Sequence, residues 1–255
     1  MPVEIEVDAT LAAADAALEA QAEAKQEARN RRRAESRAPY IGLSALGDEC
    51  ERRTYYRAHG PAVAERMDAT SIKRIQDGYA SEDVMAKRLR MVPGVTLVTV
   101  NPDDGRQITV EGLGGRLRGA LDGVAMGLLH LPATTWAVWE AKAVGQKSFD
   151  KLAKLKAERG DDAALSEWNA NYRVQAQGYM GYTGLQHHFM TVSTPGVRDW
   201  IALKTTFQPV EFEALEAKAE RILSARVPLA RVSNNPTFYL CKMCQFKEIC
   251  HGSGA

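Results

Sequence analysis

The sequence lacks any run of 18 consecutive apolar residues, so we expect no transmembrane helix. Its start, MPVEIEVDAT, lacks the basic residues and apolar stretch of a secretory signal peptide, which favours a cytoplasmic protein. It also lacks a charge excess of one sign, since 33 basic and 32 acidic residues leave a net charge of +1. That balance neither supports nor excludes a nucleic-acid partner, because a local patch does the binding.

Cysteine is scarce, with four in 255 residues. In a reducing cytosol these are expected to be thiols or metal ligands rather than disulfides. The remaining composition, 45% hydrophobic and 25% charged, is ordinary for a globular protein and can bury a core without a metal or disulfide. The length fits one medium domain with an appendage.

The appendage is expected at residues 1–38, as a charged helical extension, and the main domain at residues 39–255. Residues 9–37 are rich in Ala, Glu, Gln, Lys and Arg and contain no Gly or Pro, a strongly helix-forming composition. Its end carries a basic cluster, which consists of Arg29, Arg31, Arg32, Arg33 and Arg37. A solvated helix is the favoured interpretation of this cluster, and a DNA-contacting arm is the alternative.

The order of the remaining elements predicts the fold class. Capping and periodicity predict one helix over residues 45–58, with Ser44 as its N-cap, and a longer one over 68–90. Alternating or β-branched runs between turns predict four strands, over residues 95–100, 107–111, 116–126 and 136–141. Two helices, two strands and a helix follow, over residues 146–158, 162–183, 187–193, 200–206 and 210–225. This order predicts an α/β fold with a mixed sheet flanked by helices.

Two short motifs in neighbouring strands carry the chemistry. Asp122 ends the run Arg118-Gly-Ala-Leu-Asp122, and Glu140 and Lys142 lie in Trp139-Glu140-Ala-Lys142. Strand alternation puts Glu140 and Lys142 on one face, so pairing with the Asp122 strand would bring both carboxylates and the ammonium together. Two carboxylates suit Mg²⁺ or Mn²⁺, which acidifies water and neutralises phosphate charge, and the lysine can orient that water. A solvated strand face is the alternative for the Glu-x-Lys triplet alone.

The pattern GxLD followed by ExK resembles the PD-(D/E)XK nuclease superfamily, in particular its RecB-like exonuclease branch. Two further elements match that branch in type and in order. The run Gly78-Tyr-Ala-Ser-Glu82 resembles its Gly-x-x-x-Glu helix, although an exposed helical Glu82 is the alternative. The run Gln175-Ala-Gln-Gly-Tyr179 resembles its Gln-x-x-x-Tyr helix, whose spacing stacks both side chains on one face.

The resemblance implies a restriction-endonuclease-like core and a role for each matched residue. The metal ligands would be Asp122 and Glu140, with Glu82 as an auxiliary ligand. Lys142 would act on the water, and Gln175 and Tyr179 would position that lysine and contact DNA. The same helix carries Tyr172, Arg173 and Tyr182, a mixture compatible with contacts to phosphates and bases, although the two tyrosines are equally compatible with the core.

The cysteines form a second candidate site. Cys241, Cys244 and Cys250 lie within ten residues, and Cys50 lies far upstream. A Cys-x₂-Cys pair with a third cysteine nearby signals metal, and the closeness of these three disfavours unligated thiols. Four thiolates suit either zinc or a [4Fe–4S] cluster. The arrangement resembles the iron–sulfur staple of AddB-type nucleases and of the CRISPR-adaptation exonuclease family, which implies a structural [4Fe–4S] cluster.

The resemblance as a whole implies a Mg²⁺- or Mn²⁺-dependent exonuclease that cleaves DNA ends or single strands. The processes implied are recombination, repair, phage DNA metabolism or CRISPR adaptation. Relatives work as ring-shaped oligomers or with partner subunits, so a homo-oligomer or a recombination or adaptation partner protein is implied as well. Two alternatives stay open: a non-catalytic DNA-binding scaffold with a zinc-stapled nuclease fold, and a restriction-type endonuclease. The adjacent His187 and His188 point to opposite strand faces and are not expected to share a metal.

Overall fold

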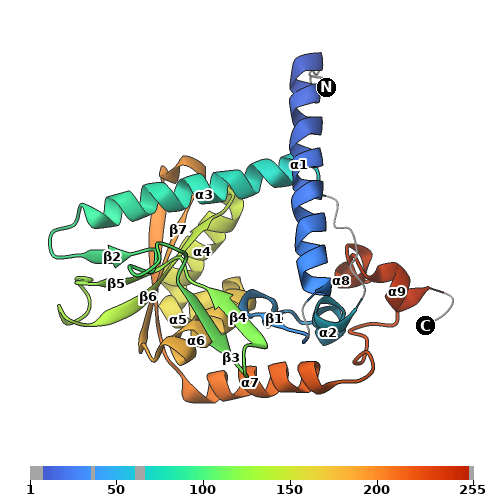
Figure 1. The fold of residues 1–255 in the computed structure, drawn as a ribbon. Helices are drawn as coiled ribbons and strands as arrows, with labels where there is room; N and C mark the ends of the chain where they lie inside the picture. Colours follow the sequence, from blue (N-terminus) through green and yellow to red (C-terminus); the bar gives the residue numbers. More distant parts are fainter. Residues whose placement is uncertain (1–7, 36–37, 61–66, 253–255) are drawn as a thin grey trace.

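The computed structural model describes residues 8–35, 38–60 and 67–252 (Figure 1). The helices longer than one or two turns are α1 (Ala9–Ala34), α2 (Glu51–His59), α3 (Ala69–Arg90), α4 (Gln146–Arg159), α5 (Asp161–Trp168), α6 (Ala170–Thr183) and α7 (Pro209–Ser224). Four short helical segments complete them: η1 (Leu43–Ala45), η2 (Pro195–Val197), α8 (Tyr239–Lys242) and α9 (Lys247–His251).

The strands form two sheets. A five-stranded sheet has the order β2-β5-β6-β7-β8, and a three-stranded sheet has the order β1-β4-β3. Their bounds are β1 (Ile41–Gly42), β2 (Thr96–Val98), β3 (Thr109–Gly112), β4 (Leu117–Ala120), β5 (Gly123–Met126), β6 (Trp136–Ala143), β7 (His187–Ser193) and β8 (Trp200–Thr206). In the larger sheet β6 and β7 are parallel and the other neighbours are antiparallel. The expected α/β fold with a mixed sheet flanked by helices is confirmed.

Helices cover the larger sheet because its apolar side chains need partners on both faces. Met85 and Leu89 of α3 pack with Trp139 of β6 in one buried cluster. Helices α4 and α5 pack on β7 and β8 in another cluster, which contains Leu152 and Met190. Helix α6 joins β6 and the small sheet to α7 in the largest cluster. The catalytic candidates therefore lie where α3, α6 and both sheets meet.

Helix α1 stands almost upright beside the body and meets α3 near the start of that helix (Figure 1). The contacts are polar: Asp15 pairs with Lys73 at 2.5 Å, and the Glu19 carboxylate accepts from the Ala69 amide at 2.8 Å. The Arg29, Arg31 and Arg32 members of the basic cluster are exposed, as a solvated helix requires. Arg37 lies outside the described residues.

Three sequence-based boundaries were wrong. The helix expected over residues 45–58 begins only at Glu51, because Ser44 lies inside η1 and Cys50 is the N-cap of α2. The helix expected over 162–183 is broken at Asn169, whose side chain accepts from the Asn171 amide at 3.0 Å and starts α6 afresh. The strand expected over 116–126 is two strands in different sheets, β4 and β5.

Candidate active site

Asp122 lies at the joint between the two sheets. The chain leaves the small sheet after Ala120 and enters the large sheet at Gly123, which pairs with Trp139 of β6. One residue further along that antiparallel register, Asp122 faces Glu140 across the strand pair. The amide of Ala141 donates to the Asp122 carboxylate at 2.9 Å, and this bond fixes its direction.

Lys142 joins the two carboxylates. Its ammonium pairs with Glu140 and lies 3.9 Å from the Asp122 carboxylate. Both residues of the Glu-x-Lys triplet share one face of β6, as strand alternation requires. The structure thus brings Asp122, Glu140 and Lys142 together in a partly buried group, with side-chain exposures of 15%, 3% and 21%.

Burial dominates the electrostatics of this group. It raises the pKa of Glu140 to about 7, against the attraction of Lys142 and with the help of the Asp122 charge. Burial alone would lower the pKa of Lys142, but the Glu140 and Asp122 carboxylates raise it above its ordinary value. The second carboxylate oxygen of Glu140, Oε2, is buried and has no hydrogen-bond partner among the described residues. The group therefore carries one buried oxygen that a cation could satisfy.

Glu82 approaches the same group from helix α3. Burial raises its pKa to about 7, and the charge of Asp122 raises it further while Lys142 opposes the shift. The side chain is half-buried rather than freely exposed, so the alternative of a purely solvent-facing helical glutamate does not describe it.

Gln175 and Tyr179 form a hydrogen-bonded pair on α6. The Gln175 amide donates to the Tyr179 hydroxyl at 2.9 Å, and that hydroxyl donates to the Ala120 carbonyl at 2.6 Å. Ala120 ends β4 two residues before Asp122, so the pair braces the segment that carries this carboxylate. Burial raises the pKa of Tyr179, and the Glu140 charge adds to the shift, which places the hydroxyl near the carboxylates.

The Tyr172 side chain lies beside Lys142. From the sequence it was equally compatible with a place in the core. Its ring centre lies 5.4 Å from the Lys142 Nζ, a cation–π distance. The signal that could have found it is helical spacing, because Tyr172, Gln175 and Tyr179 recur at i, i+3 and i+7 on one face of α6.

Arg173 and Tyr182, the other two residues of that helix singled out from the sequence, each bind a glutamate of α7. Arg173 makes a two-point contact with Glu211, at 2.9 and 2.8 Å, and pairs with Asp162 as well. Tyr182 donates to Glu216 at 2.8 Å and packs against Phe212. The Arg173 guanidinium is therefore engaged by two carboxylates, and its contact with phosphates stays a prediction.

The carboxylates of the described residues do not form a complete metal-binding site. Across residues 8–35, 38–60 and 67–252, no group of three or more His, Cys, Asp or Glu side chains is arranged to hold a metal ion. The Lys142 ammonium lies between the two carboxylates, where it balances their charge. The donor set still fits a hard cation, because it offers carboxylate oxygens and one of them, Glu140 Oε2, has no partner among the described residues.

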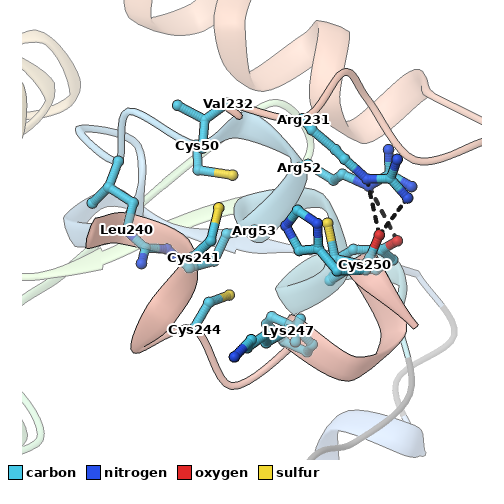
Figure 2. Close-up of a pocket in the computed structure, with 13 residues that line it drawn as sticks. Cys50, Arg52, Arg53, Arg231, Val232, Leu240, Cys241, Cys244, Lys247 and Cys250 are labelled. Atoms are coloured by element: carbon cyan, nitrogen blue, oxygen red, sulfur yellow. Dashed lines mark hydrogen bonds between the residues drawn. The ribbon is translucent and has the colours of Figure 1, made fainter. Parts of the chain in front are cut away.

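The cysteines line one pocket. Cys50, at the start of α2, meets Cys241, Cys244 and Cys250 from the C-terminal segment around a pocket of about 350 Å³ that is partly open to solvent. Figure 2 shows the four thiols turned toward this shared space, and all four are free of disulfides. Residues about 190 positions apart in the chain thus become neighbours.

The other three cysteines of the pocket affect the pKa of the Cys241 thiol. Burial raises the pKa of the Cys241 thiol, and the other three cysteines raise it further, which places all four within electrostatic reach. Arg52, Arg53, Arg231 and Lys247 also line the pocket, and none of its lining residues is acidic. Four sulfur donors with a cationic lining are suited to a thiolate-bound metal centre.

None of the helices in the described chain combines the length and apolar content that a bilayer crossing needs. Comparison with protein-family models gave no match, and comparison with curated proteins gave none either.

Solved structures of similar shape include an alkaline exonuclease (LHK-Exo) from Laribacter hongkongensis, with 14% identity, 72% of this chain and 86% of that chain covered, and a TM-score of 0.48. A phage-related exonuclease from Haemophilus somnus has 12% identity, 72% and 92% coverage and a TM-score of 0.49. LHK-Exo in complex with dAMP has 12% identity, 72% and 86% coverage and a TM-score of 0.46. At these identities and TM-scores the likeness carries no conclusion about activity, which has to come from the site.

Proposed function

We propose that this chain is a metal-dependent deoxyribonuclease of the PD-(D/E)XK type, acting as an exonuclease on DNA ends or single strands. One observation carries the proposal. The Lys142 ammonium contacts two carboxylates, those of Asp122 and Glu140, which come from adjacent segments of the chain. A structural ion pair needs only one carboxylate. A second acid and an unpartnered buried oxygen are features of a group that handles a cation.

Asp122 and Glu140 would hold Mg²⁺ or Mn²⁺, and Glu82 would be an auxiliary ligand that closes the site from α3. Bound there, the ion supplies an acidified water and neutralises charge on the scissile phosphate. The buried Glu140 Oε2 would gain the partner that it lacks among the described residues. The raised pKa of Glu140, about 7 because of burial, implies that metal binding competes with a proton at that carboxylate.

Lys142 would orient the attacking water, and its charge would offset that of the phosphate. Its own position is held from two sides, by the carboxylates and by the Tyr172 ring. Gln175 and Tyr179 would act as supports, since the Tyr179 hydroxyl holds the Ala120 carbonyl at 2.6 Å beside the Asp122 segment.

The second cofactor that we propose is a structural [4Fe–4S] cluster on Cys50, Cys241, Cys244 and Cys250, with Zn²⁺ as the alternative. Zinc bound by thiolates at about 2.3 Å needs the four sulfurs only roughly 3.8 Å apart, whereas a cluster core needs a wider space. Across the described residues no group of three or more His, Cys, Asp or Glu side chains is placed to hold a metal ion, so the preference for the cluster rests on the resemblance in the sequence.

The biological setting that we propose follows from the resemblance in the sequence. It is cytoplasmic DNA recombination or repair, phage DNA metabolism or CRISPR adaptation, with DNA as the substrate and a homo-oligomer or a recombination or adaptation protein as a partner. The exposed Arg29, Arg31 and Arg32 lie near the C-terminal end of α1, the end that Figure 1 shows beside the body of the protein, and they are cations that a DNA backbone could contact.

The decisive test is digestion of end-labelled single-stranded and double-stranded DNA by the purified full chain, with Mg²⁺, with Mn²⁺ and with EDTA. We expect cleavage of linear substrates that EDTA abolishes, and no cleavage of closed circular DNA. Cleavage of closed circles would replace the exonuclease by an endonuclease.

The matched variants are Asp122→Asn, which removes one ligand charge at constant size, and Asp103→Asn, which changes an exposed turn aspartate. Only the first is expected to lose cleavage, with folding checked by circular dichroism. Full activity in D122N would remove Asp122 from the mechanism, and inactivity of the wild type on every substrate would favour a non-catalytic scaffold.

A further inference from the structure

The rim of the cysteine pocket contains one cation that differs from the others in how it is held. Arg52 donates to the Leu229 carbonyl at 3.1 Å and to the Tyr56 hydroxyl at 3.2 Å, and Arg231 donates to the Cys250 carbonyl at 2.9 Å, so among the described residues neither pairs with a carboxylate. Arg53 instead binds a buried side chain, Asp48. Its Nη2 donates to Asp48 Oδ1 at 2.6 Å, and its Nε contacts Oδ2. A two-point contact of this kind fixes the plane of a guanidinium group.

Asp48 binds the Cys50 amide and Arg57 as well as Arg53. It is 5% exposed, and its Oδ1 also accepts from the Cys50 amide at 2.9 Å. A second guanidinium, that of Arg57, lies 3.6 Å from its Oδ2. One buried carboxylate thus sets both the backbone of a candidate ligand and the direction of Arg53.

The same segment is anchored to the body of the protein. The Lys218 ammonium of α7 donates to the Leu46 carbonyl at 2.6 Å and to the Asp48 carbonyl at 2.8 Å. These bonds tie the loop before Cys50 to the helix that precedes the C-terminal cysteines. The loop can therefore hold Arg53 and Cys50 in fixed relation to the other three thiols.

We propose that Arg53, locked by Asp48, is a positioning residue for a four-thiolate metal centre in the cysteine pocket. The inference rests on the proposed cysteine centre and goes beyond it. Four thiolates carry more negative charge than either a zinc ion or an iron–sulfur core neutralises, so the centre as a whole is an anion. In a partly closed pocket without an acidic lining residue, a fixed guanidinium offsets that charge.

An arginine serves this purpose better than a mobile lysine. Its charge does not titrate in the working range of a protein, and its planar fork is held in advance by Asp48. Lys247 lines the same pocket, but the ion pairs of Asp48 are with Arg53 and Arg57. Lys247 therefore provides the comparison, as a charge of the same sign in the same pocket without that lock.

The experiment measures metal retention rather than nuclease activity. Full-length wild type, Arg53→Met and Lys247→Met are reconstituted anaerobically with iron and sulfide. Iron per chain and the absorbance near ~400 nm are then followed after addition of EDTA. We expect R53M to lose iron about 10- to 100-fold faster than wild type, the usual effect of removing an outer partner of a metal ligand. We expect K247M to stay within about threefold of wild type.

Equal rates for R53M and wild type, or for R53M and K247M, would overturn the inference. Should R53M fail to fold, Arg53→Lys serves instead, because it keeps the charge and loses the two-point contact with Asp48. A rate for R53K above about threefold that of wild type supports the lock, and a wild-type rate refutes it. If wild type itself holds neither iron nor added zinc, the proposed centre fails, which is a different result from a loaded wild type with an unaffected R53M.

Discussion

Replacing His188 by leucine is expected to make the protein more stable and less sensitive to acid. His188 lies on the inner strand β7, between β6 and β8, and is 1% exposed. Neither of its ring nitrogens has a hydrogen-bond partner among the described residues. A buried polar ring without partners destabilises the folded state, and an apolar side chain of similar volume removes that penalty.

The acid sensitivity follows from the pKa. Burial lowers the pKa of His188 to about 3, and the charges of Lys142 and Arg173 lower it further. In the unfolded chain an imidazole titrates near ~6.5, so the unfolded state binds the proton first as the pH falls. The contribution of His188 to the free energy of unfolding is therefore constant above about pH 6.5 and decreases below it, by about 1.4 kcal/mol per pH unit, until the folded pKa is reached.

The magnitudes can be tested by urea denaturation followed by tryptophan fluorescence, at about pH 7.5 and about pH 5.5. Wild type should lose about 1.4 kcal/mol more than His188→Leu between these pH values. At about pH 7.5, H188L should be more stable by roughly 1 kcal/mol. The control is His188→Gln, which cannot titrate but keeps a polar group, so it should lose the acid sensitivity without the gain at neutral pH.

Two outcomes would refute this reasoning. The first is an equal stability difference between wild type and H188L at both pH values, which would mean that His188 already carries its proton when folded or finds a polar partner. The second is a lower stability of H188L at neutral pH, which would mean that the ring packs in a way that leucine cannot reproduce.

Four other predictions concern the site and the cysteines. Lys142→Met should lower the cleavage rate by about 10²–10³ in single-turnover assays, the usual effect of removing one group that stabilises charge in the transition state, and an unchanged rate would contradict its role. Glu82→Gln should raise the Mn²⁺ concentration for half-maximal cleavage by about tenfold, as an auxiliary ligand would, whereas total inactivity would make it a principal ligand. Tyr179→Phe removes the bond to Ala120, so urea denaturation should give a loss of about 1–3 kcal/mol together with slower cleavage; a stable but slow variant would separate positioning from folding. Cys244→Ala should lose iron and solubility, because a centre that joins Cys50 to the C-terminal segment closes a long loop and so stabilises the folded state by on the order of 4–5 kcal/mol. A folded, fully active variant would rule out this structural role for the centre.

Local signals in the sequence were sufficient for most elements. The helix over residues 68–90 matches α3, because an aspartate N-cap and a following Pro-Gly pair are short-range signals. The strand containing Glu140 and Lys142 was found because its alternation places both on one face. The starts of α2 and α6 were misplaced, because Cys50 caps α2 without a side-chain bond and the bond from the Asn169 side chain that starts α6 lies inside a continuous helix-forming stretch.

The sequence by itself determined the types of residue available for chemistry and their order along the chain: an acid, a second acid with a lysine, a glutamine–tyrosine helix and four cysteines. Only the tertiary structure decided how they meet. It moves the chain from one sheet to another at Asp122, so that this acid faces Glu140, and it sets Tyr172 against the lysine while engaging Arg173 elsewhere. It also places Asp48 behind Arg53 at the cysteine pocket. These meetings depend on backbone pairing and side-chain packing between distant segments, and no periodicity within a single segment encodes them.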